Sequence, residues 1–248
     1  MLVEALRPAQ EAAFGPGEYV EQESFVRASE IRRLAERAGV GPGVSLLDLC
    51  CGVAGPGRFL ARQLRCDYLG VDSSESAVAV ARDRAAGLPC RFEVREIPPL
   101  PSGTFEVVLL LETILAFRDK KALLTEVARA LSAGGRFAFT LEEGAPLTGA
   151  ERARMPEADT VWLTPLEELE ALLAEAGLAT RWSEDWSESH GAVAASLAES
   201  YAAEATSPAE QIGRGRVEEL IATHRLWSEW LATGRVRKLA LVAERGPK

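Results

Sequence analysis

The chain has 248 residues, of which 47% are hydrophobic and 26% are charged, and its formal net charge is −9 at pH 7. This composition indicates a globular chain with one large domain or at most two. No apolar run approaches the roughly 20 residues of a membrane span, and the first residues lack the apolar core of a signal peptide. We therefore expect a cytoplasmic protein without a membrane partner. The negative net charge also disfavours nucleic acid as a partner, because nucleic-acid phosphates bind to basic surfaces.

The cysteines argue against a disulfide framework, since two of the four, Cys50 and Cys51, are adjacent. No Cys-x-x-Cys pair or histidine cluster indicates a metal site, so we expect no bound metal. This usage of cysteine fits a reducing cytoplasm.

Residues 46–61 predict a strand, a tight turn and a helix. An apolar run ends at Asp48 and Leu49, as a buried parallel strand does, and a turn of small residues follows. Pro56 stands where the helix would begin, because its fixed φ suits the first helical turn. Small residues let a ligand approach the backbone, and a helix N-terminus offers free N–H donors. Such a unit opens a nucleotide-binding α/β sheet.

The letters of this turn, Asp-x-Cys-x-Gly-x-Ala-Gly-Pro from Asp48 onward, resemble motif I of the class I S-adenosylmethionine-dependent methyltransferases. Cys50 and Ala54 replace the outer glycines of the usual Asp-x-Gly-x-Gly-x-Gly, and both replacements are small. A dinucleotide-binding turn would instead read Gly-x-Gly-x-x-Gly, with no acidic residue before it. The chain is thus similar to the small-molecule branch of this family. The resemblance implies S-adenosyl-L-methionine as cofactor and S-adenosyl-L-homocysteine as product.

The order of later segments, over about residues 44–141, extends the resemblance. A strand at 66–71 ends in Asp72, where an acid can accept hydrogen bonds from both ribose hydroxyls; capping of the next helix is the alternative role. In the family, an acid after the third strand contacts the adenine amino group, and the next apolar residue packs on the ring. Glu96 and Ile97 occupy these places, although Glu96 is alternatively a surface charge. The cofactor-binding residues expected are Asp48, Cys50, Gly52, Ala54, Asp72, Ser73, Glu96, Ile97, Leu111, Tyr19 and Gln22.

We expect an α/β fold with a doubly wound, mostly parallel, seven-stranded sheet of the Rossmann-like methyltransferase type, whose antiparallel last strand is implied by the resemblance. Residues 1–18 are expected to be an arm or loop. Strands are expected at 44–49, 66–71, 91–95, 104–111, 136–141, 178–182 or beyond, and 236–244. Helices are expected at 21–38, 56–64, 73–85, 119–131, 164–177, 192–204 and 208–232.

This order divides the chain into four regions. They are an N-terminal arm and helix that cover the cofactor (1–43), the cofactor-binding core (44–186), a helical lid or substrate insertion (187–234), and the final core strand with a tail (235–248). In related small-molecule methyltransferases, an insertion before the last strand builds a lid over the substrate. A pair of dimerisation helices is the alternative for 187–234, and we expect a monomer or a homodimer.

Three residues are candidates for catalysis. Methyl transfer requires donor and acceptor in line, and a hydroxyl acceptor also needs a base. His190, in a polar stretch just beyond a strand, is the general-base candidate because imidazole titrates near neutral pH; an exposed histidine without a role is the alternative. Glu142 ends the fifth strand, where it can hold an amine or help to activate His190, or be merely solvated. Tyr19 can contact the methyl group or only pack.

Aromatic residues in the loop and insertion regions suggest an apolar or planar acceptor pocket, with core packing as the alternative role for many of them. The expected acceptor-binding residues are Glu112, Phe117, Trp162, Trp186, His190, His224 and Trp227. The sequence therefore predicts an enzyme that moves a methyl group to an oxygen, nitrogen or carbon atom of a small molecule. The alternatives are a non-catalytic S-adenosylmethionine-binding or interaction protein and, against the acidic charge, a protein or RNA methyltransferase.

Overall fold

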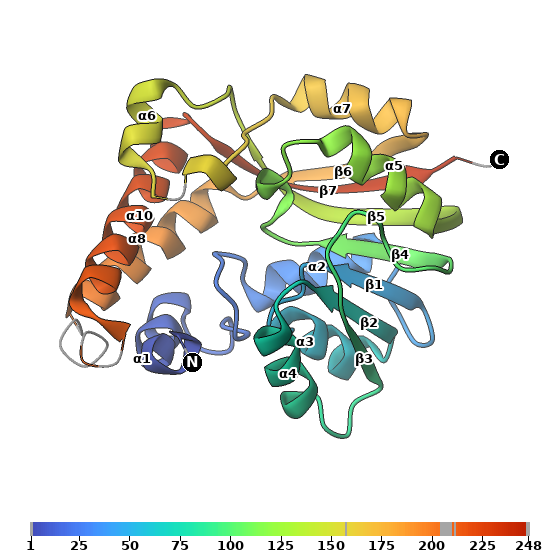
Figure 1. Ribbon diagram of the computed structural model, residues 1–248, viewed down its shortest axis with the longest axis horizontal. Helices are drawn as coiled ribbons and strands as arrows, with labels where there is room; N and C mark the ends of the chain where they lie inside the picture. Colours follow the sequence, from blue (N-terminus) through green and yellow to red (C-terminus); the bar gives the residue numbers. More distant parts are fainter. Residues whose placement is uncertain (1, 157, 204–209, 211, 247–248) are drawn as a thin grey trace.

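The structure is a computed structural model that describes residues 2–156, 158–203, 210 and 212–246. These residues form a seven-stranded sheet in the order β3-β2-β1-β4-β5-β7-β6 (Figure 1). The strands are β1 (Ser45–Leu49), β2 (Asp67–Asp72), β3 (Cys90–Val94), β4 (Phe105–Leu110), β5 (Leu131–Glu143), β6 (Leu178–Asp185) and β7 (Arg237–Arg245). Strands β1 to β5 pair in parallel, and β7 pairs antiparallel with both β5 and β6. The predicted fold class is confirmed, including the antiparallel last strand.

Helices cover both faces of this sheet, with α2, α3 and α4 on one side and α5 and α7 on the other (Figure 1). Adjacent residues of β1 explain the two layers. Leu46 belongs to the core beneath α2 and α3, whereas Leu47 belongs to the core beneath α5 and α7, because successive side chains of a strand point to opposite faces. The bounds are α2 (Ala28–Arg37), α3 (Gly55–Leu64), α4 (Glu75–Arg84), α5 (Lys120–Ala130) and α7 (Leu166–Glu175).

A third group of helices stands beside the sheet rather than on a face. Figure 1 shows α8 and α10 side by side, with α1 against them, on the left of the view. Leu6, Val193, Leu197 and Tyr201 pack together between α1 and α8. This group comprises α1 (Leu2–Phe14), α8 (Ser187–Ala203) and α10 (Arg214–Thr233); short elements nearby are η1 (Ile114–Ala116), α6 (Gly149–Arg154) and η2 (Ala158–Thr160). None of the described helices combines the length and apolar character that crossing a bilayer requires.

The N-terminal region differs from the prediction in two ways. The expected arm at 1–18 is largely the helix α1, because Leu6, Ala9 and Phe14 are buried against other residues and this packing outweighs Pro8. The expected helix from 21 begins only at Ala28. The Arg27 amide donates to Glu30 Oε2 at 2.9 Å, which caps the helix there and leaves residues 20–27 as a non-helical strap.

The C-terminal helices also differ from the expected bounds. α8 begins at Ser187, five residues before the expected start, so His190 lies in its first turns and not in a polar loop. The reason is local, since Asp185 Oδ1 accepts a hydrogen bond from the Ser187 amide at 2.9 Å and the His190 amide donates to Trp186 O. The parts of the two expected helices at 204–209 and 211 lie outside the described residues.

Candidate functional site

The turn after β1 is tied to the end of β2 by one carboxylate. The Gly52 amide donates to Asp72 Oδ2 at 2.8 Å, and the Ser74 amide donates to Asp72 Oδ1 at 2.9 Å. Gly52 has a φ of +53°, which favours glycine. A Cβ at this position would meet nothing within 4 Å. The backbone at Gly52 therefore borders open space, as a turn that a ligand approaches should.

A cavity of about 310 Å³ lies along this turn, and we call it the cofactor pocket. Asp48, Cys50 and Gly52 line it from one side, and Leu111 lines it from the end of β4. Asp48 is 4% exposed and accepts a hydrogen bond from the Tyr68 hydroxyl at 2.6 Å. Burial raises the pKa of Asp48 to about 7, against the opposing effect of this hydrogen bond and with a further contribution from the Asp72 charge.

A smaller cavity of about 140 Å³ continues from the cofactor pocket, because Cys50 lines both. Its lining combines two acids, Asp72 and Glu96, with the apolar side chains of Ile97 and Phe117. Acids suit the hydroxyls of a ribose and the amino group of adenine, and apolar side chains suit the faces of a ring. The joined cavities and their donor and acceptor groups therefore fit S-adenosylmethionine.

The strap at residues 20–27 covers the cofactor pocket, which Glu21, Gln22, Glu23 and Ser24 help to line. Its backbone lies directly on the start of α3. A Cβ on Gly55 would stand 1.8 Å from the carbonyl oxygen of Val20. Glu21 holds the strap by ion pairs with Arg58 and, at 3.1 Å each, with Arg7 and Arg84.

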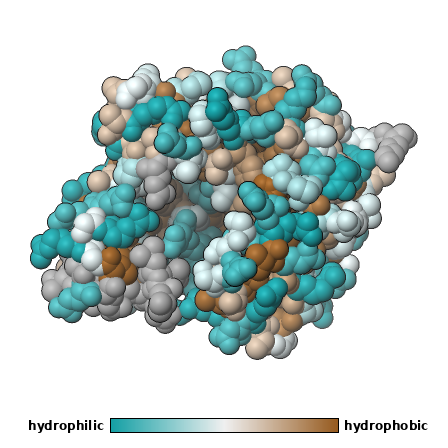
Figure 2. Space-filling model, in the orientation of Figure 1, coloured by the Kyte–Doolittle hydropathy of each residue, from teal (hydrophilic) through white to brown (hydrophobic). Residues whose placement is uncertain are grey.

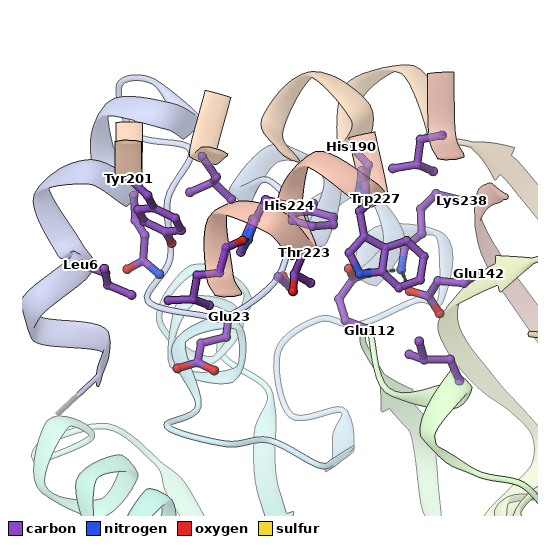
Figure 3. Close-up of a pocket in the computed structure, with 17 residues that line it drawn as sticks. Leu6, Glu23, Glu112, Glu142, His190, Tyr201, Thr223, His224, Trp227 and Lys238 are labelled. Carbon is purple, nitrogen blue, oxygen red and sulfur yellow. Dashed lines mark hydrogen bonds and ion pairs between the residues drawn. The ribbon is translucent and has the colours of Figure 1, made fainter. Parts of the chain in front are cut away.

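A second cavity of about 300 Å³ adjoins the cofactor pocket, and we call it the acceptor pocket after the ligand that we propose for it. Glu23, Ser24 and Glu112 line both. Figure 2 shows the surface hollowed between the α1, α8 and α10 group and the end of the sheet. Figure 3 shows that the side chains lining the acceptor pocket converge from helices on one side and from strand ends on the other. The other residues that line the acceptor pocket include Leu6, Phe25, Glu142, His190, Leu197, Tyr201, Leu220, His224, Trp227, Leu231 and Lys238.

A buried ion cluster forms one end of the acceptor pocket (Figure 3). The ammonium of Lys238 pairs with Glu112 and Glu142, and Thr140 Oγ1 donates to Glu112 Oε1 at 2.9 Å. Burial is the largest single influence and would raise the pKa of Glu112, but the Lys238 charge, His190 and the hydrogen bonds from Lys238 and Thr140 together lower that pKa. Burial would lower the pKa of Lys238, and the two carboxylates raise it instead. Both shifts favour the charged forms of Glu112 and Lys238.

His190 is fully buried, and Glu30 on α2 fixes its orientation. The Nε2 atom of His190 lies 3.2 Å from Glu30 Oε2, whereas Nδ1 is buried without a hydrogen-bond partner among the described residues. The Trp186 ring packs on the imidazole with the ring centroids 5.8 Å apart. If Nε2 carries the proton that Glu30 accepts, Nδ1 holds a free lone pair.

The structure distributes the residues predicted from the sequence over distinct places. Gln22, Asp48, Cys50, Gly52 and Leu111 line the cofactor pocket, and Asp72, Ser73, Glu96 and Ile97 line its smaller continuation. Glu112, Glu142, His190, His224 and Trp227 line the acceptor pocket. Phe117, expected on the acceptor side, lines the small cavity beside Ile97.

Four predicted residues line none of these three cavities. The Tyr19 hydroxyl donates to Gln10 Oε1 at 2.6 Å and its ring packs on Phe14, so α1 holds it. Ala54 is fully buried at the start of α3. Trp162 lies near two guanidinium groups, 4.9 Å and 5.1 Å from its ring centroid, and lines a different cavity with them. Trp186 packs on His190 and does not reach the acceptor pocket.

The charged residues of this site that the sequence analysis missed include Glu23, Lys238 and Glu30. Lys238 precedes the apolar run 239–243, and a lysine at the edge of such a strand is a signal that it has a buried partner. Glu30 gave no signal, because it lies 160 residues before His190.

Comparisons with known proteins agree with this geometry. A family model described as a methyltransferase domain matches residues 46–135. The 27-O-demethylrifamycin SV methyltransferase of Amycolatopsis mediterranei is 34% identical over 185 residues, which cover 68% of each chain. Phosphoethanolamine N-methyltransferase 3 of Arabidopsis thaliana is 34% identical over 103 residues, 40% of this chain but only 21% of that one.

The fold is also that of a solved methyltransferase. Phosphoethanolamine N-methyltransferase 2 of Haemonchus contortus, solved in complex with S-adenosyl-L-methionine, superposes with a TM-score of 0.81 at 18% identity. The superposition covers 99% of this chain and 60% of that one.

Proposed function

Since the chain belongs to the class I S-adenosylmethionine-dependent methyltransferase family, we propose that it transfers a methyl group from this cofactor to a small-molecule acceptor. One observation carries the proposal. The two cavities share the lining residues Glu23, Ser24 and Glu112, so a ligand in one lies next to a ligand in the other. Direct transfer between two bound small molecules requires such a shared boundary.

We assign the cofactor frame to residues that line its pocket. Asp72 accepts hydrogen bonds from the ribose hydroxyls, and Glu96 accepts one from the adenine amino group. Ile97 and Phe117 pack on the adenine ring. Asp48, beside Gly52 in the larger cavity, binds the methionine part. The positions of these side chains in two joined cavities support the assignment.

The cofactor, when bound, supplies an electrophilic methyl group: the acceptor lone pair forms a bond to the methyl carbon, and sulfur keeps the electron pair of the broken carbon–sulfur bond in S-adenosyl-L-homocysteine. The protein must align the acceptor and remove its proton. We propose that Nδ1 of His190, which lines the acceptor pocket, accepts this proton. Glu30 then holds the imidazole ring in the required orientation. Glu142 binds the acceptor beside it.

The two coverings of the site have separate roles in this proposal. Residues 1–43 cover the cofactor, because the strap lies over its pocket, and 187–234 enclose the acceptor, because α8 and α10 form a wall of the acceptor pocket. Both coverings exclude water from the reacting groups. The cofactor-binding core at 44–186 and the final strand with its tail at 235–248 complete the proposed division of the chain. We further propose a cytoplasmic monomer or homodimer that uses neither nucleic acid nor a membrane. The net charge of −9 and the four free cysteines support this.

Calorimetric titration with S-adenosyl-L-methionine and S-adenosyl-L-homocysteine tests the cofactor frame. Asp72→Ala should weaken binding of both by about 1.5–3 kcal/mol, as expected when a hydrogen bond to a charged group is lost. Asp67→Ala is the matched control, because Asp67 is exposed at the other end of β2 and should bind normally. Labelled methyl donor then identifies acceptors. Wild-type protein that binds neither compound would contradict the assignment.

A further inference from the structure

The acceptor pocket indicates the chemical class of its ligand. We propose that this ligand is an amine carried on an apolar body, and that its nitrogen is held by the carboxylates of Glu112 and Glu142. The inference rests on the proposed function, because it names the acceptor of the same site.

The charges that line the pocket favour a cation. Glu23, Glu112 and Glu142 contribute three carboxylates. Lys238 is the only lysine or arginine among the described lining residues, and it is already paired with Glu112 and Glu142. A phosphate or carboxylate on the ligand would therefore lie beside like charges without a free cation to pair with. An ammonium group would reduce the excess negative charge.

One carboxylate oxygen of the ion cluster needs a donor. Glu142 is 7% exposed, and its Oε2 atom is buried without a hydrogen-bond partner among the described residues. A buried acceptor without a donor destabilises the folded state, and a ligand N–H group could satisfy it after a small movement of the side chain. This orphaned oxygen points to a ligand that donates hydrogen bonds.

The position of the cluster places the nitrogen at the boundary of the two pockets. Glu112 lines both the cofactor pocket and the acceptor pocket. An amine bound by Glu112 and Glu142 therefore lies on the cofactor side of the acceptor pocket. His190, which lines the same pocket, can take the proton that an ammonium group must lose before its lone pair is free.

The remainder of the pocket suits an apolar body. Leu6, Leu197, Leu220 and Leu231 line it from α1, α8 and α10, together with the aromatic ring of Trp227. Aromatic rings also attract a nearby ammonium through their electron-rich faces. Glu112, Glu142 and Lys238 thus lie together at the strand ends, and the helices contribute these apolar side chains together with uncharged polar groups such as Tyr201 and Thr223 (Figure 3).

Three compounds with one skeleton test the proposal: 4-phenylbutylamine, 4-phenylbutan-1-ol and 4-phenylbutanoate. Calorimetric titration of each into the full chain at pH 7.5, with and without S-adenosyl-L-homocysteine, measures the preference of the pocket. We expect the amine to bind at least about tenfold more tightly than the alcohol, since a charge-assisted hydrogen bond is the stronger kind. The carboxylate should bind most weakly. Carboxylate binding as tight as that of the amine would overturn the proposal.

Glu142→Gln separates charge from shape. It should weaken amine binding about tenfold and alcohol binding much less, because only the amine loses an ionic partner. Glu143→Gln is the matched control: Glu143 pairs with Arg237 and lines neither pocket, so the preference should persist. An amine preference that is unchanged in Glu142→Gln would overturn the assignment to this carboxylate. If Glu142→Gln does not fold, the three-compound series on the wild-type chain decides.

The cofactor titration keeps the two proposals distinguishable. Wild-type protein that binds S-adenosyl-L-homocysteine but prefers the carboxylate refutes only the amine class. Wild-type protein that prefers the amine but binds no cofactor supports the ligand class and refutes the proposed methyl transfer.

Discussion

The two pockets of this protein are built in different ways. The cofactor pocket and its continuation take most of their lining from the segments after β1, β2, β3 and β4, which follow one another along the chain. The acceptor pocket takes its lining from α1, the strap, three strand ends and two late helices, between Leu6 and Lys238. Apart from the strap, short local motifs therefore form the first pocket, whereas the second depends on pairs of residues far apart in sequence.

Removal of Lys238 should show this dependence most strongly. Lys238→Met would leave Glu112 and Glu142 buried without their cation, and loss of one partner from a buried ion pair typically costs about 3–5 kcal/mol. We expect a loss of this size in the free energy of unfolding, measured with urea. Lys121→Met is the control, because its ion pair with Glu175 is exposed and should contribute little. A similar stability for the two variants would contradict the view that this cluster organises the acceptor side.

The cofactor side should instead be sensitive to backbone approach. A Cβ at Gly55 would meet the carbonyl oxygens of Val20 and Glu21 at 1.8 and 2.3 Å, so Gly55→Ala must displace the strap. We expect a loss of about 1–3 kcal/mol in unfolding free energy, together with weaker binding of S-adenosyl-L-homocysteine in calorimetry. Gly41→Ala should be silent in both measurements, because its Cβ would meet nothing within 4 Å. Normal cofactor binding by Gly55→Ala would mean that the strap does not cover the cofactor.

The smallest expected effect concerns pH and Asp48. The pKa of about 7 means that Asp48 is mostly protonated at pH 6 and mostly ionised at pH 8. A cationic cofactor prefers the ionised form, so its affinity should rise as pH rises through this range, by about tenfold if only the ionised form binds. Asp48→Asn should remove this dependence, measured by titration at both values. An equally steep dependence in Asp48→Asn would assign the titration to another group.

The sequence was sufficient for the sheet and for bringing many of the residues proposed to bind the cofactor to the same cavities. The turn at 50–54, Asp72 and Ile97 occur in the expected order because each belongs to a local strand–turn–helix unit. An N-terminal segment over the cofactor was expected, but the helix α1 and the non-helical conformation of the strap were not predicted, since burial against α8 and α3 outweighs their local pattern. Tyr19 was expected to contact the cofactor because it lies in an N-terminal segment of the kind that folds over it in related enzymes, and Trp162 was expected to contact the acceptor because it is an aromatic residue of a loop. The hydrogen bond to Gln10 and the guanidinium groups of Arg118 and Arg152 hold them elsewhere.

The acceptor pocket was only partly predictable. Its aromatic and histidine side chains could be named as candidates, but the pairing of Lys238 with Glu112 and of Glu30 with His190 could not. Nothing in a local pattern links residues separated by 126 or 160 positions, and only the packing of the strands and helices brings them together.

The position of β7 has a consequence for how the chain folds. β7 is the last strand in sequence, yet it lies between β5 and β6, and β6 pairs with no other strand among the described residues. Strands β1 to β5 can assemble as they leave the ribosome, whereas the far edge of the sheet must wait for residues 237–245. Closing such a long loop is slow, because its entropy is lost before the contacts form. We therefore expect the half of the sheet that carries the cofactor pocket to acquire amide protection first, and the edge formed by β7 and β6 to acquire it only after residues 237–245 have been synthesised.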